Sequence, residues 1–210
     1  MTERPIMFKG PMVRAILDGT KTQTRRVAKL TAGGHVKEPG GHRRWHPADP
    51  EAVLACPYGQ PGDRLWVREG FAIDAAAHAP DGHYGLTYLA DGTWIEMDYS
   101  EIDERRLTPG KKYPSIYMPR WASRLLLEIV AVRVERVREI SEGDCIAEGI
   151  EDLGDGVGKM ETARGASYSM VLSLFAALWD SINAKRGHGW TTNPWVWVVE
   201  FKVCSSEKET

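Results

Sequence analysis

The chain alternates between apolar stripes at helical spacing and runs in which apolar and polar residues alternate. The first stripe lies in GPMVRAILDG, residues 10–19, which reads as a short helix. Pro11 suits the first helical turn, and Gly19 suits a left-handed stop. Four apolar residues share one face of this predicted helix: Met12, Val13, Ile16 and Leu17.

Two further segments predict helices. In SEGDCIAEG, residues 141–149, Ser141 is an N-cap with Asp144 three residues later, which is the pattern of a capping box, and Gly149 ends the helix. Residues 168–187 carry the longest apolar stripe, and Gly187 follows it. We therefore predict a helix of one to two turns and then a long one.

Alternating runs predict strands, and two of them flank Asp91-Gly92 as a hairpin, HYGLTYLA and TWIEMDY. Residues 31–62 are rich in Gly, Pro and His and predict a long loop. Because the strands are grouped with few crossovers, we expect an α+β fold whose sheet is a small barrel. The other predicted strands are 20–27, 63–71, 123–137 and 193–203.

Composition narrows the function classes. A chain of 210 residues with 42% apolar and 27% charged residues is typical of one globular domain. A net charge of −2 argues against coating duplex nucleic acid by bulk charge, while a small nucleobase or nucleoside needs only a local site. Three scattered cysteines, no N-terminal apolar run and no stretch long enough to span a membrane lead us to expect a cytoplasmic protein.

The segment GTKTQTRR, residues 19–26, holds the first candidate chemistry. The Thr24 hydroxyl is a nucleophile only if a base removes its proton, and Lys21 is a base only when it is neutral. Burial, or the nearby positive charges of Arg25 and Arg26, would favour the neutral amine. Residues i and i+3 of a regular strand face opposite sides, so this pairing needs a bend or bulge. The alternative is a polar strand with solvated charges.

Three other residues are candidates with equally plain alternatives. Glu148 is either a functional carboxylate or a solvated residue on a helix surface. Glu69 lies beside Arg68, so it makes either an ion pair or a substrate contact. Trp121 either offers a face for a base or packs in the core or at its rim. Histidines and cysteines lie in no ligand motif, so we expect no metal and no cofactor.

The segment also resembles the GxKxxxxR signature of the ASCH family, a group of PUA-like domains, with Gly19, Lys21 and Arg26 at the fixed positions. Further blocks agree, among them CPYGQPGDRLWVRE, PSIYMPRWASRLLLEI and ISEGDCIAEGI. The resemblance implies a small β-barrel with flanking helices, as a single domain over residues 1–210. Insertions are implied at about 31–60, 72–114 and 152–166.

One branch of that family removes the acyl group from N4-acetylcytidine. The resemblance assigns Lys21 as base, Thr24 as nucleophile and Glu148 as the third catalytic residue, with Arg26 binding substrate. Glu69 and Trp121 are added here as substrate contacts. Those relatives are about half this length, so the insertions would reshape the pocket. The alternatives within the family are an RNA-binding module, using Arg25, Arg26, Arg43, Arg44 and Trp121, or a ribonuclease.

Overall fold

The computed structural model describes residues 1–75, 84–97, 107–150, 160–161 and 167–204. The chain divides into two compact units. One unit holds Met1–Asp18, Arg64–Leu127 and Val203–Thr210, and the other holds Gly19–Asp63 and Glu128–Lys202. Each unit combines segments that are distant in sequence. The single domain stays a prediction.

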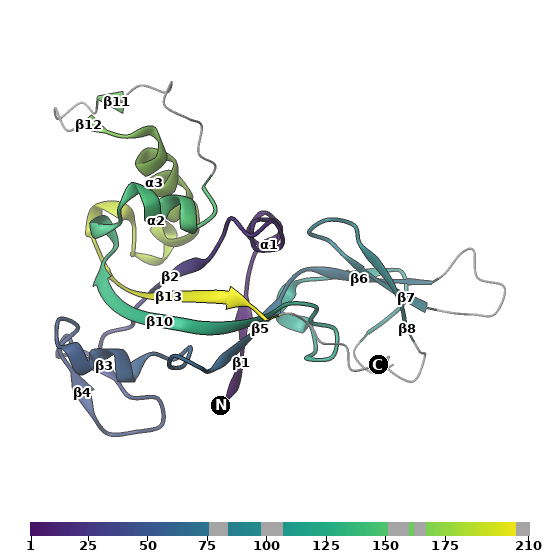
Figure 1. Cartoon of the computed structure of the whole chain (residues 1–210), viewed down its shortest axis with the longest axis horizontal. Coiled ribbons are helices and arrows are strands. Elements are labelled where there is room, and N and C mark those ends of the chain that lie inside the picture. The colour runs from purple at the N-terminus through teal and green to yellow at the C-terminus, as the bar shows by residue number, and fades with distance from the viewer. Residues whose placement is uncertain (76–83, 98–106, 151–159, 162–166, 205–210) are drawn as a thin grey trace. The chain divides into compact units, whose positions relative to one another are not determined.

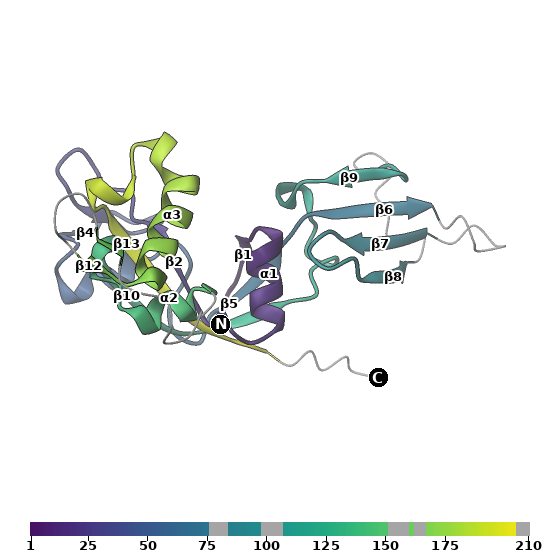
Figure 2. The ribbon, with the colours of Figure 1, turned by 90° about the horizontal axis from the view of Figure 1, so that it is seen from above.

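The first unit contains a parallel strand pair, a short helix and an antiparallel sheet. Strand β1, Glu3–Met7, pairs with β5, Arg64–Arg68, and helix α1 spans Gly10–Leu17. The sheet has the order β8-β7-β6-β9, and its strands lie side by side in Figure 2. These strands are β6 Phe71–Ala75, β7 Tyr84–Tyr88, β8 Trp94–Met97 and β9 Lys111–Tyr113.

The predicted hairpin at Asp91-Gly92 is confirmed. Strands β7 and β8 are antiparallel, and Gly92 takes a φ of +78°, a conformation that glycine adopts without a steric penalty. The Asp91 carboxylate accepts a hydrogen bond of 3.0 Å from the backbone N–H of Thr93. The core of this sheet is built largely on Phe71, Ile73, Leu86 and Tyr88.

The second unit has three main strands in the order β10-β13-β2, covered by helices. In Figure 1, α2 and α3 lie on one side of these strands, and the small hairpin of β3 and β4 lies on the other. The helices pack against β13 through a buried apolar cluster that includes Cys145, Phe175, Trp179, Val196 and Val198.

The second unit contains the predicted helices and long strands, together with short strands that the sequence pattern did not predict. Strand β10 begins in the first unit and continues into the second. The bounds are β2 Gln23–Val27, β3 Val36–Lys37, β4 Arg44–Trp45, a 3-10 helix Pro50–Ala55, β10 Leu126–Arg136, α2 Glu142–Ala147, β11 Met160–Glu161, β12 Ser167–Tyr168, α3 Met170–Asn183 and β13 Trp195–Val203.

All three predicted helices are confirmed, and Gly19 and Gly149 follow α1 and α2 with φ values of +76° and +87°, as left-handed helix stops require. The third helix is shorter than predicted: α3 spans Met170–Asn183, and Gly187, with a φ of +80°, ends the 3-10 helix Ala184–Arg186 that follows it. The capping box is also present. The Ser141 hydroxyl accepts a hydrogen bond of 3.1 Å from the backbone N–H of Asp144, whose carboxylate accepts one of 3.4 Å from the Ser141 N–H.

The α+β class is confirmed, whereas the barrel is not. Among the strands that the structure describes, no sheet closes on itself. The 31–62 loop contains the β3–β4 hairpin and a 3-10 helix, and the 72–114 segment supplies most of the four-stranded sheet. Most of the insertion expected at 152–166 lies outside the described residues. No helix in the described ranges is long and apolar enough to cross a membrane.

Candidate active site

The segment 19–26 brings three polar side chains against helix α2. Side chains two residues apart in an extended chain share a face, and Lys21, Gln23 and Arg25 all reach α2. The Lys21 ammonium donates to the Glu148 carbonyl at 2.7 Å and to Glu148 Oε2 at 2.8 Å. The Gln23 amide donates to the carbonyl and carboxylate oxygens of Asp144, both at 3.0 Å.

Helix α2 presents Asp144 and Glu148 together because they are four residues apart. The Ser141 cap fixes the first turn, and Glu148 is the C-cap, whose backbone N–H donates to the Asp144 carbonyl at 2.9 Å. Just before β2, the Thr22 N–H donates to the Ala147 carbonyl, also at 2.9 Å. This backbone contact holds the end of α2 directly over the start of β2.

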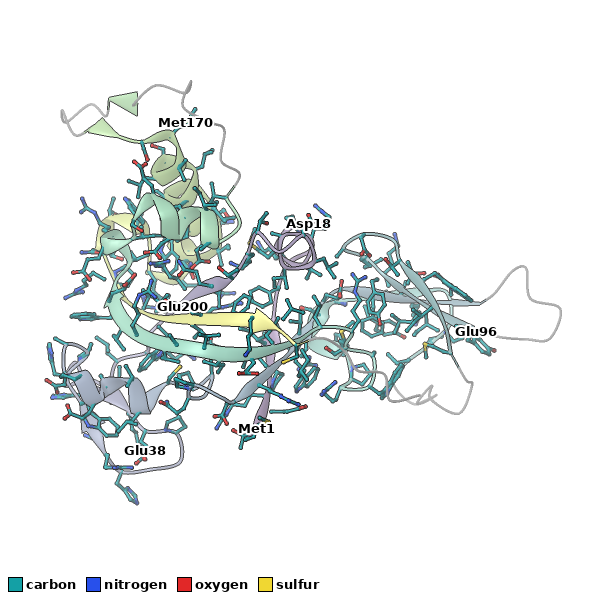
Figure 3. The ribbon with its side chains drawn as sticks, viewed as in Figure 1. Met1, Asp18, Glu38, Glu96, Met170 and Glu200 are labelled. Atoms are coloured by element: carbon teal, nitrogen blue, oxygen red, sulfur yellow. The ribbon has the colours of Figure 1, made fainter. Side chains whose placement is uncertain are left out.

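Arg25 connects the two acidic residues of α2 to β10. Its side chain has no solvent exposure. Arg25 Nη2 lies 2.5 Å from Glu135 Oε1 and 3.1 Å from Asp144 Oδ2, and Arg25 Nη1 lies 3.4 Å from Glu148 Oε1. Arg133 extends the network outward by pairing with Glu135, Asp144 and Glu200. In Figure 3, side chains rich in nitrogen and oxygen fill the space beneath α2, and Glu200 is labelled on β13.

Burial is the largest influence on the pKa of Lys21, and it lowers that pKa below its ordinary value. The Glu148 carboxylate opposes this shift, since its charge and hydrogen bond favour the ammonium. The positive charges of Arg26 and Arg25 lower the pKa further, and the balance is a lowered value. Lys21 is therefore a buried amine that loses its proton more readily than a lysine in water.

Burial alone would raise the pKa of Asp144, but its partners outweigh that effect. The Gln23 hydrogen bond, the Arg25 charge and the Ser141 hydrogen bonds together hold the pKa below its ordinary value. Burial raises the pKa of the neighbouring Cys145 thiol to about 12, so this cysteine stays protonated at neutral pH. It belongs to the apolar core of the unit and takes no part in the polar network.

The structure brings Lys21 and Glu148 into contact. Thr24 is buried in β2 opposite Val199 of β13, and strand alternation turns its side chain to the face away from Gln23 and Arg25. Arg26 lies two residues after Thr24 in β2, on the same face of the strand, and pairs with Trp197 of β13. Its positive charge lowers the pKa of Lys21. The catalytic roles of Lys21, Thr24 and Glu148, and the binding role of Arg26, remain predictions.

Glu69 and Trp121 belong to the first unit. Glu69 is buried and makes an ion pair with Arg124, whose Nε and Nη2 donate to its two oxygens at 2.9 and 3.1 Å. Burial raises the pKa of Glu69, although Arg124 opposes the shift. Trp121 is 43% exposed. Their role as substrate contacts stays a prediction.

Sequence reasoning missed most of the network around Lys21. It treated Asp144 only as a capping residue, and it assigned no part to Gln23, Arg133 or Glu135. One signal was present: Gln23 and Arg25 follow Lys21 at intervals of two, so the whole set shares one face of an extended chain. The contribution of β10 had no comparable signal, because only the fold places Glu135 beside Arg25.

Within the described ranges, no group of three or more His, Cys, Asp or Glu side chains lies close enough to hold a metal ion.

No protein-family model and no curated protein sequence matches the chain. One solved structure is similar to it, a high-resolution crystal structure of an ASCH domain from Lactobacillus crispatus JV V101. The two share 11% sequence identity with a TM-score of 0.42, over 96% of this chain and 79% of that one.

Proposed function

We propose that the chain is an amidohydrolase of the ASCH type that cleaves the N4-acyl amide of N4-acylated cytosine nucleosides or bases. The products are the free cytosine compound and a carboxylic acid. The observation that carries the proposal is the buried Lys21–Glu148 pair, three residues from a threonine in the segment that resembles the family signature.

Lys21 has the environment that a lysine base needs. Its burial and the neighbouring arginine charges favour the neutral amine, so a larger fraction of it can accept a proton near neutral pH. Glu148 holds the nitrogen through two acceptors, the carboxylate and its own carbonyl. The amine is therefore fixed in position while its affinity for protons is reduced.

In the proposed reaction, Lys21 takes the proton of the Thr24 hydroxyl as Thr24 attacks the acyl carbonyl. Arg26 stabilises the oxyanion, an interaction that is worth about 3–4 kcal/mol for a single donor in related chemistry. The C–N bond then breaks, and Lys21 returns its proton to the leaving N4 nitrogen. Water hydrolyses the acyl-threonine, which releases the acid and restores the hydroxyl.

Strand geometry adds one requirement to this mechanism. The Thr24 side chain faces away from Asp144, whereas Lys21 precedes the first residue of β2. The proton of the Thr24 hydroxyl must therefore reach the Lys21 nitrogen around the N-terminal end of β2. Substrate binding has to bring the Thr24 hydroxyl within about 3 Å of the Lys21 nitrogen.

The test is the loss of N4-acetylcytidine ultraviolet absorbance in the presence of wild-type protein and of three variants. We expect Thr24→Val, Lys21→Ala and Glu148→Ala to lose turnover by on the order of a hundredfold or more. Thr22→Val is the matched control, since Thr22 is an exposed threonine in the same segment, and it should retain activity. Absence of hydrolysis by the wild type would refute the proposal and turn attention to RNA binding and cleavage.

The nucleophile has a separate test. An acyl-threonine intermediate should survive an acid quench and be located on Thr24 by mass spectrometry, whereas hydroxylamine should release its acyl group as a hydroxamate and restore the Thr24 hydroxyl. Full activity of Thr24→Val would show instead that water attacks directly, which would overturn the assignment of Thr24.

Activity must also fall at acid pH, because Lys21 has to be neutral, and a rate constant that is flat from about pH 5 to pH 9 would contradict its role as base.

A further inference from the structure

We propose that Arg25 is the positioning residue of this site: it holds one oxygen of the Glu148 carboxylate so that the other oxygen receives the Lys21 ammonium. This inference deepens the proposed function. Its turnover predictions rest on that function, whereas its prediction for the Lys21 pKa does not. It concerns a residue outside the family signature, since the fixed positions of that pattern in this segment are Gly19, Lys21 and Arg26.

The two oxygens of Glu148 are divided between two cations. Oε2 lies 2.8 Å from Lys21 Nζ, and Oε1 lies 3.4 Å from Arg25 Nη1. Rotation of the carboxylate would weaken both contacts at once. The Glu148 carbonyl, 2.7 Å from the same lysine nitrogen, adds a third fixed point. The orientation of Lys21 thus depends on a carboxylate that Arg25 holds from the other side.

Arg25 can act as a fixed support because its own position is determined by other contacts. Its Nε and Nη2 both donate to Glu135 Oε1, at 3.1 and 2.5 Å, and Nη2 also pairs with Asp144 Oδ2 at 3.1 Å. A planar guanidinium with several donors is suited to hold carboxylates in fixed directions, whereas a lysine offers a single point charge. Burial of the whole side chain removes competition from water.

The charged groups that face Lys21 come from two elements. Glu148 on α2 favours its ammonium form, and Arg26 and Arg25 on β2 oppose it. Beyond them lie Asp144 on α2, Glu135 and Arg133 on β10, and Glu200 on β13. Removal of the Arg25 charge would take away one opposing cation and leave Glu148 with Lys21 as its remaining partner in this network. Both changes make Lys21 bind its proton more tightly.

Two substitutions separate the charge of Arg25 from its geometry. Arg25→Gln removes the charge but keeps a polar group for the buried carboxylates. Arg25→Lys keeps the charge but loses the planar set of donors. Arg133→Gln is the matched control: Arg133 belongs to the same network, and among the described residues it forms ion pairs with Glu135, Asp144 and Glu200 rather than with Glu148.

The decisive measurement is the titration of Lys21 by NMR in protein with ¹³C-labelled lysine, with the Lys21 signal assigned from its loss in Lys21→Arg. We expect Arg25→Gln to raise the Lys21 pKa measurably. Arg133→Gln should leave it unchanged, and Arg25→Lys should leave it close to the wild-type value. An unchanged pKa in Arg25→Gln, or an equal shift in Arg133→Gln, would overturn the inference.

Turnover of N4-acetylcytidine supplies a second readout. Arg25→Lys should reduce kcat by tenfold to a hundredfold, in line with the cost of misplacing a catalytic group by about 1 Å. Its pH profile should stay in place, while that of Arg25→Gln moves to higher pH. Wild-type turnover by Arg25→Lys would overturn the positioning role even if Arg25→Gln fails to fold. A wild type that is inactive would refute the amidohydrolase, while the NMR titration would still decide the role of Arg25.

Discussion

Replacement of Glu148 by Gln tests the buried ion pair as a contribution to stability. The side chains of Lys21 and Glu148 are only 1% and 7% exposed, so water cannot solvate an ammonium that loses its carboxylate. Removal of one partner of a buried pair costs about 3–5 kcal/mol. Glutamine still offers an acceptor oxygen, which places our expectation near 3 kcal/mol. That is a large part of the 5–15 kcal/mol by which a typical domain is stable.

A double-mutant cycle separates the pair from other effects of the substitution. Lys21→Met removes the ammonium, so Glu148→Gln should cost less than about 1 kcal/mol when it is introduced into Lys21→Met. Urea unfolding followed by tryptophan fluorescence measures all four free energies. Additive costs in the double variant would refute the reasoning, because they would show that the two side chains do not stabilise each other.

The pH dependence gives the same prediction a definite sign. An unfolded lysine has a pKa of about 10.4, and that of Lys21 in the folded protein is lowered, so between the two values the unfolded state binds more protons. Stability from this group therefore rises with pH in that window. In Glu148→Gln the Lys21 ammonium has lost its carboxylate partner, so its folded-state pKa falls further and deprotonation recovers more of the lost stability. The deficit should shrink as the pH rises from the folded-state Lys21 pKa of the variant to that of the wild type, and a deficit that is constant or grows as wild-type Lys21 titrates would contradict the argument.

Three other predictions concern groups around the site and in the first unit. Ser141→Ala removes the N-cap of α2 and should lower the free energy of unfolding by about 1 kcal/mol in urea titrations, with less loss for Ser141→Asp, which can still cap. Cys145, which is buried with a pKa near 12, should react with a thiol reagent at pH 8 far more slowly than the partly exposed Cys204, and equal rates would contradict its burial. Glu69→Ala leaves Arg124 with Asp91 as its remaining ion-pair partner and should lower the free energy of unfolding by about 3 kcal/mol. A loss below about 1 kcal/mol would show that the Glu69–Arg124 pair does not stabilise the fold.

Local patterns were enough to predict the helices and the main strands. A proline at the start of α1, a Ser-x-x-Asp pattern at α2 and glycines at the helix ends act through short-range sterics and hydrogen bonds. The alternating runs predicted β5, β10 and β13, and Asp91-Gly92 predicted the hairpin. Periodicity placed β2 three residues too early, because Thr22 pairs with the end of α2 and with Phe201 before the regular strand begins.

The sequence by itself identified Lys21 and Thr24 as candidates, because a lysine, a threonine and two arginines in one short segment stand out whatever the fold, and the family resemblance added Glu148. Only the tertiary structure decided which of them meet. The packing of α2 over the start of β2 places Glu148 against Lys21, although 127 positions separate them. The same packing turns Gln23 and Arg25 towards α2 and Thr24 to the other face. Burial then lowers the pKa of Lys21, and burial depends on the assembled chain, so no local pattern of residues could predict it.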